Sequence, residues 1–377
     1  MKPVLIRLKI EDELTHVQYD PNIKAKLVYD GKTFTVPEEL GKPTPEQLMG
    51  SVPEQVSELC GRICYDSLGK GRGSTDYHKH LLQVGHFSVY EHVHFTAVIE
   101  PEDSNYGMTL LVLANRPGLT IAIPKEDHRK LRITFNPRHL LDWEFWDANS
   151  FIHDDMKWTN HELRKSLVDN CNPIIPSILQ SYPSLDKWVA SGAELVEPLY
   201  PSEKWVTMYL SGSRGMSHEQ VRHRFCISQR STRYVDESES AYITHPLITN
   251  YAIDTKELDP FGVHQAKWQC AGIYDNITAS LSEWLRGKGI DKFTARKQAR
   301  GAARGYLGNA LATELMFSAP INMWKHMLRL RCSIHADAEI RVMYASVLEE
   351  LRKSQYAEYF SDLELVPSGD GIGQVLK

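Results

Sequence analysis

The sequence predicts an α/β protein, because segments with strand patterns and segments with helix patterns alternate along it. Residues 92–100 place apolar side chains at every second position, which is typical of a strand with one buried face. Residues 131–135 and 205–210 are predicted as further strands. Residues 54–67 and 336–351 instead repeat apolar side chains at helical spacing.

Further elements are predicted from the same two periodicities. A strand is expected at residues 4–10, and helices are expected at residues 76–84, 213–220 and 273–285. Glycines follow the first and the last of these helices, as is typical of helix C-termini.

The composition is that of a soluble globular protein with a large core. The 377 residues are 42% hydrophobic and 24% charged. The net charge of −5 argues against a protein that coats nucleic acid. No apolar run reaches membrane-spanning length, and Arg7 and Lys9 interrupt the apolar N-terminus, which a secretory signal would not tolerate. We therefore expect a cytoplasmic protein with neither nucleic acid nor membrane as a partner.

Six cysteines are scattered along the chain without a CxxC pair. This distribution predicts neither a zinc knuckle nor a disulfide framework, and it fits a reducing cytosol. Cys226 lies among arginines that would favour a thiolate, but no adjacent residue could act as its base. We expect Cys226 to be a small buried apolar residue.

The densest chemical feature is the segment VRHRFCISQRSTRY at residues 221–234. It holds four arginines and one histidine, with serine and threonine hydroxyls between them. Guanidinium groups bind phosphate through paired hydrogen bonds, and hydroxyls with free backbone N–H groups complete such a pocket. The alternative is a solvated basic face that pairs with acidic neighbours.

Two other basic groups occur in the C-terminal half. Arg300 and Arg304 are expected to share one helix face, because they are four residues apart. The other group lies where the last helix begins and comprises Arg329, Arg331, His335 and Arg341. Taken alone, each of these residues is more often a solvated surface residue than part of a binding site.

Histidines cluster between residues 78 and 94. His92 and His94 would share one face of a strand, as a metal-binding pair requires, but no third ligand is defined. No catalytic metal is therefore predicted, and cofactor contacts or core hydrogen bonds explain these imidazoles as well.

Taken together, these motifs resemble those of the flavin-dependent thymidylate synthase family. Arg222-His223-Arg224 followed by Ser231-Thr232-Arg233-Tyr234 is similar to the signature of that family. The other similar segments are GHFSVYEHVHFT at residues 85–96, SRGMSHEQV at 213–221, AARGYL at 302–307 and MLRLRCSIHADAEIR at 327–341.

The resemblance covers residues 54–100 and 205–355. It implies one α/β (α+β) domain, with a mixed sheet flanked by helices, in a homotetramer whose active sites lie at subunit interfaces. The expected organisation is an N-terminal arm at residues 1–53, a domain at 54–355 with an insertion at about 103–200, and a tail at 356–377.

The resemblance also implies roles for individual residues. The dUMP-binding positions are Glu219, Arg222, Ser231, Thr232, Arg233, Arg304 and Arg331. The flavin-contacting positions are Ser88, Glu91, His223, Arg224, Gln229, His326 and His335. Arg331 is the expected catalytic residue, since a fixed cation beside the uracil favours ionisation at its N3.

The reaction that this resemblance implies is the reductive methylation of dUMP to dTMP. FAD is the expected cofactor, and NADPH and 5,10-methylenetetrahydrofolate are the expected co-substrates. No protein cysteine attacks the pyrimidine in this reaction, and the sequence contains no Pro-Cys nucleophile motif. The flavin carries the chemistry, while the protein supplies orientation and charge.

Three features depart from the family pattern. The link between Arg224 and Ser231 is one residue short, Pro320-Ile321-Asn322 replaces an Asn-x-Arg flavin motif, and Gln229 stands where Glu is common. Two alternatives therefore stay open. One is flavin- and folate-dependent hydroxymethylation of a pyrimidine nucleotide, and the other is a non-catalytic nucleotide-binding homologue.

Overall fold

The computed structural model describes residues 19–100, 119–139, 194–257, 259 and 261–377. The strand predicted at residues 4–10 and most of the predicted insertion lie outside the described residues.

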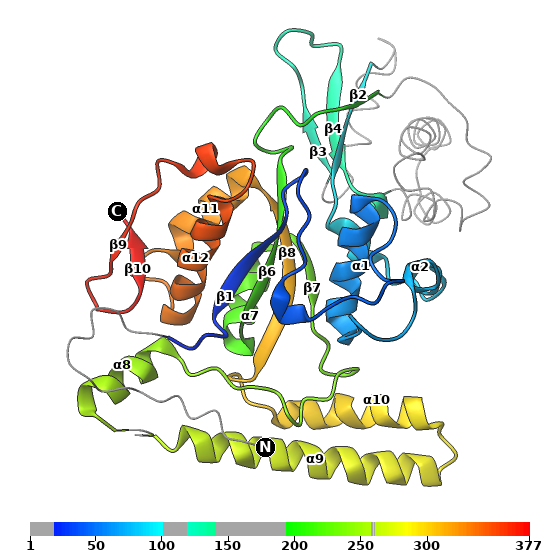
Figure 1. Cartoon of the computed structure of the whole chain (residues 1–377), viewed down its shortest axis with the longest axis vertical. Coiled ribbons are helices and arrows are strands. Elements are labelled where there is room, and N and C mark those ends of the chain that lie inside the picture. Colours follow the sequence, from blue (N-terminus) through cyan, green and yellow to red (C-terminus); the bar gives the residue numbers. More distant parts are fainter. Residues whose placement is uncertain (1–18, 101–118, 140–193, 258, 260) are drawn as a thin grey trace, which may run out of the picture.

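A four-stranded sheet in the order β1-β6-β8-β7 forms the centre of the fold (Figure 1). Its strands are β1 (Lys24–Tyr29), β6 (Trp205–Ser213), β8 (Ala312–Pro320) and β7 (Cys226–Gln229). The long pair β6 and β8 is in register from Trp205 opposite Pro320 to Ser213 opposite Ala312. The strand predicted at 205–210 is confirmed and continues to Ser213.

The predicted α/β class, a sheet flanked by helices, is confirmed. A mixture of parallel and antiparallel strand pairs was expected. Each neighbouring pair described in this sheet is instead antiparallel. β6 and β7 do run in the same direction, as a strand-helix-strand unit requires. β8 is inserted between them and runs opposite to both, which gives the α+β arrangement.

One face of the sheet is covered by α11 (Ile321–Arg331) and α12 (Ala338–Leu351). The apolar stripe predicted for the last helix is fully buried there, which confirms that prediction: Ile340, Met343, Tyr344, Val347, Leu348 and Leu351. Trp324 of α11 is also fully buried, and its indole Nε1 donates a hydrogen bond to the carbonyl oxygen of Val206 at 3.0 Å.

The opposite face of the sheet is covered by α1 (Val52–Tyr65), with α2 (Ser74–Gln83) beside it. Side chains of β6 alternate between the two faces, so Met208 packs toward α11 and α12 while Tyr209 packs toward α1. Both helices were predicted within two or three residues of their observed ends.

A second, smaller sheet in the order β3-β4-β2-β5 stands at the upper end of the central sheet in Figure 1. Its strands are β2 (Phe95–Ile99), β3 (Thr120–Ala122), β4 (Leu131–Phe135) and β5 (Glu194–Val196). The strand predicted at 131–135 is confirmed. The strand predicted to begin at His92 begins at Phe95 instead, because the imidazole of His92 is held by side chains of the central sheet.

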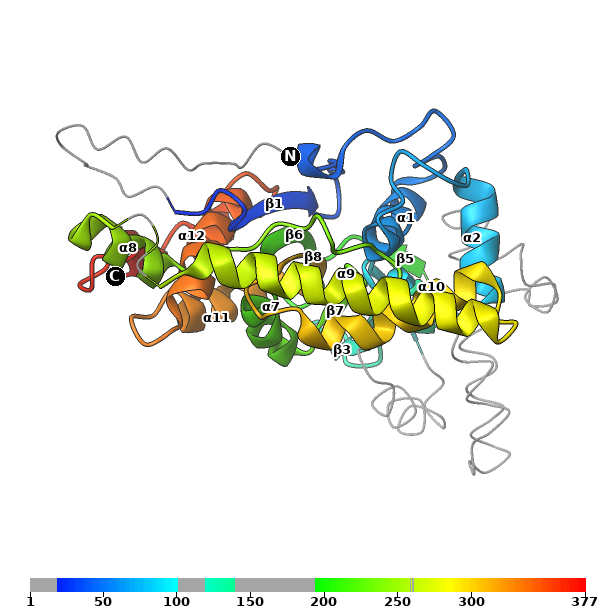
Figure 2. The same cartoon turned by 90° about the horizontal axis from the view of Figure 1, so that it is seen from below.

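A helical layer lies across the other end of the central sheet. It consists of α8 (Pro246–Thr255), α9 (Val263–Gly287) and α10 (Lys292–Ala303). Figure 1 shows α9 and α10 side by side beneath the strands, and Figure 2 shows the same layer from below. The helix predicted at 273–285 is part of α9, which begins earlier than the apolar pattern indicated because its first turns are largely exposed.

The remaining elements are short. They are η1 (Glu38–Leu40), η2 (Phe87–Glu91), α7 (Arg214–Gln220), η3 (Val221–His223), η4 (Arg304–Tyr306), η5 (Ala357–Phe360), β9 (Leu365–Pro367) and β10 (Gln374–Leu376). Among the described helices, none is long and apolar enough to cross a membrane.

Candidate active site

The basic segment is positioned by the turn from α7 into β7. Ser213 begins α7, because its side-chain oxygen accepts a hydrogen bond from the backbone N–H of Met216 at 3.0 Å. Arg224 then adopts a left-handed conformation with φ of 57° at the end of η3. Only Arg224 and Phe225 connect η3 to β7, so the chain turns tightly at this point.

Arg331 at the end of α11 meets two side chains from the end of α7 and from η3. Its Nη1 forms an ion pair with Glu219 Oε2 at 2.6 Å, and its Nη2 donates to the Glu219 carbonyl oxygen at 3.1 Å. Its Nε donates to His223 Nε2 at 3.0 Å. The structure therefore brings together the predicted catalytic residue, one predicted dUMP residue and one predicted flavin residue.

The hydrogen bond from Arg331 fixes the protonation state of His223. A guanidinium can only donate, so His223 Nε2 must be unprotonated and the ring proton must lie on Nδ1. Burial, together with the charge of Arg331 and the neighbouring His326, lowers the pKa of His223 to about 4. His223 is therefore a neutral imidazole with one N–H available to a ligand.

A second group of predicted dUMP residues lies at the start of the loop that follows β7. The backbone N–H of Ser231 donates to the Cys64 carbonyl oxygen of α1 at 3.0 Å, and the Thr232 side chain is buried. Arg233 is exposed and lies over Gly301 of α10. The loop thus carries hydroxyls and a solvent-facing guanidinium close together.

Arg300 and Arg304 differ in burial, although the backbone N–H of Arg304 still bonds to the Arg300 carbonyl oxygen. Arg300, in α10, is 7% exposed, donates to the Tyr234 carbonyl oxygen at 2.7 Å and pairs with Asp236. Arg304 lies beyond the end of α10, in η4, and is exposed. Arg300 therefore supports the loop, while Arg304 remains available to a ligand.

Within one chain these residues do not form a single pocket. Glu219 and Arg331 lie on the face covered by α11 and α12, whereas Ser231 lies against α1 on the opposite face. The predicted dUMP residues are therefore divided between two places. Either place would need further residues to enclose a nucleotide.

The predicted flavin residues differ in how available they are. Ser88, Arg224, His326 and His335 are exposed. Gln229 Nε2 instead donates to Ser217 and Thr313 hydroxyls at 3.1 and 3.2 Å, and Glu91 pairs with Arg138. Hence the first four residues present polar groups to solvent, while the other two form a hydrogen bond or an ion pair with other residues of the same chain.

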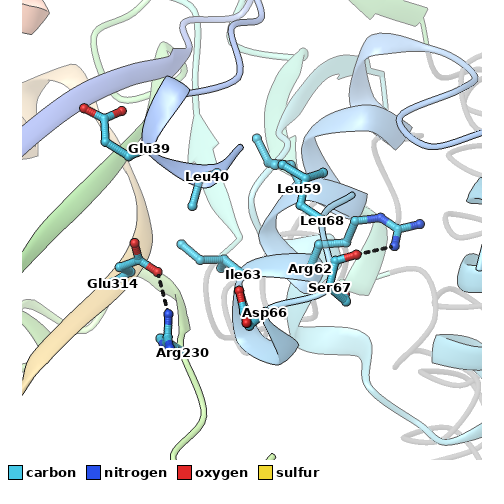
Figure 3. A pocket seen from close by; sticks show the side chains of 10 residues that line it. All are labelled: Glu39, Leu40, Leu59, Arg62, Ile63, Asp66, Ser67, Leu68, Arg230 and Glu314. Carbon is cyan, nitrogen blue, oxygen red and sulfur yellow. Dashed lines mark hydrogen bonds and ion pairs between the residues drawn. The ribbon is translucent and has the colours of Figure 1, made fainter. Parts of the chain in front are cut away.

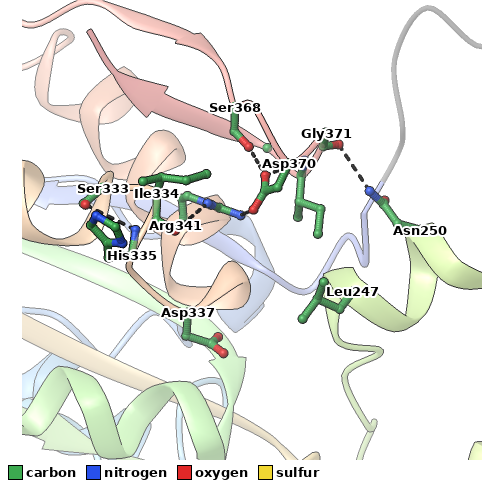
Figure 4. A network of polar contacts seen from close by, with 12 residues as sticks. Leu247, Asn250, Ser333, Ile334, His335, Asp337, Arg341, Ser368, Asp370 and Gly371 are labelled. Atoms are coloured by element: carbon green, nitrogen blue, oxygen red, sulfur yellow. Dashed lines mark hydrogen bonds and ion pairs between the residues drawn. The ribbon is translucent and has the colours of Figure 1, made fainter.

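The basic residues around the start of α12 differ in burial. Arg341 is 1% exposed and pairs with Asp370 at 2.6 Å, which holds the C-terminal hairpin against α12 (Figure 4). His335 lies in the loop before α12 and is exposed. Arg341 is therefore structural, and the sequence pattern alone did not separate it from Arg331.

The histidines near residue 92 form a buried polar network. His92 Nδ1 and Nε2 are hydrogen-bonded to the hydroxyls of Ser318 at 2.7 Å and Ser228 at 2.9 Å. Burial lowers the pKa of His92 to about 3, so it is neutral. His94 stacks on Trp205. No group of three or more potential metal-ligating side chains occurs among the described residues.

Cys226 is buried, as predicted for a small apolar residue. Burial raises the pKa of its thiol well above the ordinary value, so the arginines nearby do not activate it.

Two arginines near the loop were not predicted as site residues. Arg214, the first residue of α7, is close enough to Arg304 that the second charge, after burial, lowers its pKa. Two arginines that lie close together in the fold are typical of an anion-binding site. Arg230 precedes Ser231 and pairs with Glu237 and Glu314. Its partners are distant in sequence, so no local pattern identified its role.

Comparison with known proteins gives a family for this arrangement. Residues 205–355, which carry both groups of arginines, match the family described as thymidylate synthase complementing protein. The similarity to this family is thus carried by residues 205–355, which make up less than half of the chain.

Curated flavin-dependent thymidylate synthases also match part of the chain. A flavin-dependent thymidylate synthase from Corynebacterium efficiens is 36% identical over 167 residues, which cover 44% of this chain and 64% of that protein. One from Mycobacterium sp. (strain KMS) is 37% identical over 171 residues, or 44% and 65% of the two chains. The match thus spans less than two thirds of the length of these relatives.

Solved structures of thymidylate synthase X from Helicobacter pylori, described with FAD and dUMP, are similar to 59% of the chain. The identity is 18% and the TM-scores are 0.29 and 0.30.

Proposed function

We propose that this protein catalyses the FAD-dependent reductive methylation of dUMP to dTMP, with 5,10-methylenetetrahydrofolate as one-carbon donor and NADPH as reductant. The observation that carries the proposal is a set of uncompensated arginines at the positions that the family uses for the nucleotide. Arg222, Arg233 and Arg304 are exposed and, within the described part of the chain, have no ion-pair partner. A phosphate would supply the missing negative charge.

The loop after β7 is the proposed phosphate site. Ser231 and Thr232 supply hydroxyls, and Arg233 supplies a guanidinium with free N–H groups. Arg304 and Arg214 add two further positive charges near the start of α7. Bidentate contacts from arginine and hydrogen bonds from hydroxyls together define a monophosphate site.

Arg331 is the proposed catalytic residue at the uracil. Glu219 holds Nη1 and His223 holds Nε, so the guanidinium has a fixed direction. A preoriented cation stabilises the negative charge that develops on the uracil when its N3 ionises. Because Glu219 also accepts hydrogen bonds, it is proposed to bind the pyrimidine together with Arg222.

The residues near the start of β7 fit a flavin. Arg224 and His326 are exposed, and His223 has a free Nδ1–H. Three buried polar atoms in this region have no hydrogen-bond partner among the described residues: His94 Nδ1, Trp205 Nε1 and Asn322 Oδ1. When bound, FAD would pass reducing equivalents to the one-carbon unit. We propose Ser88, Glu91, Arg224, Gln229, His326 and His335 with His223 as the residues that hold it.

A homotetramer is part of the proposal. All 25 residues of α9 are described, and only Tyr274 is buried. Trp268 is 60% exposed and Trp284 is 56% exposed on the same helix. Exposed aromatic side chains of this size are typical of a surface that another subunit covers. Partner subunits would also complete a site whose residues are divided within one chain.

A cytoplasmic location is proposed as well, in keeping with the free thiols of the described cysteines.

A spectroscopic and binding experiment tests the proposal against the non-catalytic alternative. The purified protein, reconstituted with FAD, is expected to show a flavin absorbance band and to bind dUMP by calorimetry. Arg233→Ala and Arg304→Ala should each weaken dUMP binding about tenfold or more, through the loss of a charge-assisted phosphate contact. Lys353→Ala, a change at an exposed side chain beyond the end of α12, serves as the control. A protein that binds neither FAD nor dUMP would exclude the proposed activity.

A further inference from the structure

We propose that Arg230 is a positioning residue that sets the affinity for dUMP by anchoring the loop of Ser231, Thr232 and Arg233 to β8. The inference rests on the proposed function, since it concerns the nucleotide that this loop is proposed to hold. Arg230 itself contacts protein rather than nucleotide.

The first anchor is on the central sheet. The backbone N–H of Arg230 donates to the Glu314 carbonyl oxygen of β8 at 2.9 Å, which continues the β7–β8 ladder by one residue. Its side chain turns to the same residue, with Nη1 3.4 Å from Glu314 Oε2 (Figure 3). Glu314 is itself fixed by the hydroxyl of Tyr209, which donates to Oε1 at 2.8 Å.

The second anchor is the far end of the loop. Arg230 Nε lies 3.5 Å from Glu237 Oε1, and the Glu237 side chain is only 1% exposed. Ser240 donates to the other oxygen of the same carboxylate. One guanidinium therefore joins the beginning of the loop, its end at Glu237 and the strand β8.

The charge of Arg230 is already neutralised by these contacts. Two carboxylates face its guanidinium, and Asp66 of the α1 terminus also lines the small cavity beside it. A phosphate would meet negative charge at this position. Arg230 therefore acts on the nucleotide through the loop, unlike Arg233, which is exposed.

The loop has two other supports, so the loss of Arg230 is expected to misplace it rather than unfold it. Ser231 donates through its backbone N–H to the Cys64 carbonyl oxygen, and Arg300 holds the Tyr234 carbonyl oxygen and Asp236. A displacement of about 1 Å in a binding group can cost a large factor in function. The effect should appear in dUMP affinity more than in turnover at saturating dUMP.

The experiment compares dUMP binding to the FAD-reconstituted full-length protein in four forms. Arg230→Gln is expected to raise the Kd and the KM for dUMP by about tenfold, while kcat changes by less than about threefold. Arg230→Lys, which keeps the charge but loses the planar fork, should recover part of the affinity. Lys353→Gln, which removes an exposed cation paired with Glu350, should match the wild type.

A further variant keeps the test valid if Arg230→Gln fails to fold. Arg230→Gln combined with Glu237→Gln removes the buried carboxylate together with its cation, and it should show the same loss of dUMP affinity. Wild-type affinity in a folded Arg230→Gln or double variant would overturn the inference while leaving the proposed function intact. No dUMP binding by the wild-type protein would overturn both.

Discussion

At the scale of single residues, the contact between Arg331 and His223 determines what each can do. The guanidinium donates to His223 Nε2, so the imidazole cannot take a second proton without losing that bond. A neutral donor at Nδ1 and a fixed cation are thereby held side by side. This pairing gives a ligand both a hydrogen-bond donor and a positive charge without a change in protonation.

The pKa of His223 gives a direct prediction. Burial and then Arg331 lower it from 6.5 to about 4. Because the unfolded chain takes up this proton at a higher pH than the folded one, the contribution of His223 to stability is complete above pH 6.5 and falls as the pH drops toward 4. Histidine ring NMR, with the His223→Gln variant to assign the signal, should show a neutral Nδ1–H tautomer at pH 6. A titration midpoint near 6.5 would contradict this.

The buried ion pair of α1 gives a second prediction at this scale. Arg62 and Glu58 are both fully buried, and Arg62 Nη2 lies 2.6 Å from Glu58 Oε1. Arg62→Ala would leave a buried carboxylate without a cation, so the free energy of unfolding should fall by about 3–5 kcal/mol. Lys70→Ala breaks an exposed pair with Asp66 at the same sequence spacing and should cost less than about 1 kcal/mol. Urea unfolding measures both, and equal losses would refute the distinction.

At the scale of elements, α7 links the two groups of candidate residues. Its first residue, Arg214, lies near Arg304, and its last turn carries Glu219. Its first turn is fixed from two sides. Ser213 caps the helix, and its hydroxyl also donates to Glu339 Oε2 of α12 at 2.6 Å.

The Ser213 contact predicts the effect of one substitution. Ser213→Ala removes the helix cap and leaves Glu339 without one of its buried donors, so unfolding free energy should fall by about 2 kcal/mol. Ser361→Ala, which removes an exposed hydroxyl bonded to the Glu358 carbonyl oxygen, is the control and should change little. Thermal and urea unfolding provide the measurement. A loss in Ser213→Ala no larger than in the control would show that the cap is dispensable.

The elements that could be predicted from sequence are those whose buried apolar side chains follow a regular spacing. α12 repeats large apolar side chains at helical spacing and buries all of them, so its stripe was predicted residue by residue. α9 is exposed along most of its length, so apolar spacing indicated only its second half. The prediction that a strand begins at His92 was wrong for a different reason. The imidazole of His92 is hydrogen-bonded to Ser228 and Ser318, which are far away in the sequence.

The candidate site shows the same limit. The motif at residues 221–234 indicated an anion site, because arginines and hydroxyls are dense there. Its assignment to a nucleotide and a flavin came from the family resemblance. The partners of Arg331 and Arg230 could not be predicted from spacing, since Glu219 and Glu314 reach them only through the fold.

At the scale of the whole molecule, the exposed aromatic side chains of α9 predict assembly. Trp268→Ser combined with Trp284→Ser should reduce the mass of the particle measured by light scattering, because the apolar surface between subunits is lost. Met49→Ser, a change at an isolated exposed side chain, should leave the mass unchanged. A monomeric wild-type protein would contradict the proposed tetramer and with it the sharing of the site between subunits.

The most direct test of the proposed activity is the mass of the nucleotide formed from dUMP. The FAD-reconstituted protein would be incubated anaerobically with dUMP, 5,10-methylenetetrahydrofolate and NADPH, with Arg331→Ala as the catalytic variant. We predict dTMP from the wild-type protein and a strong loss of product in the variant, which should still bind FAD. A hydroxymethylated nucleotide, or unchanged dUMP from a protein that binds both flavin and dUMP, would contradict the proposal that this chain is a thymidylate synthase.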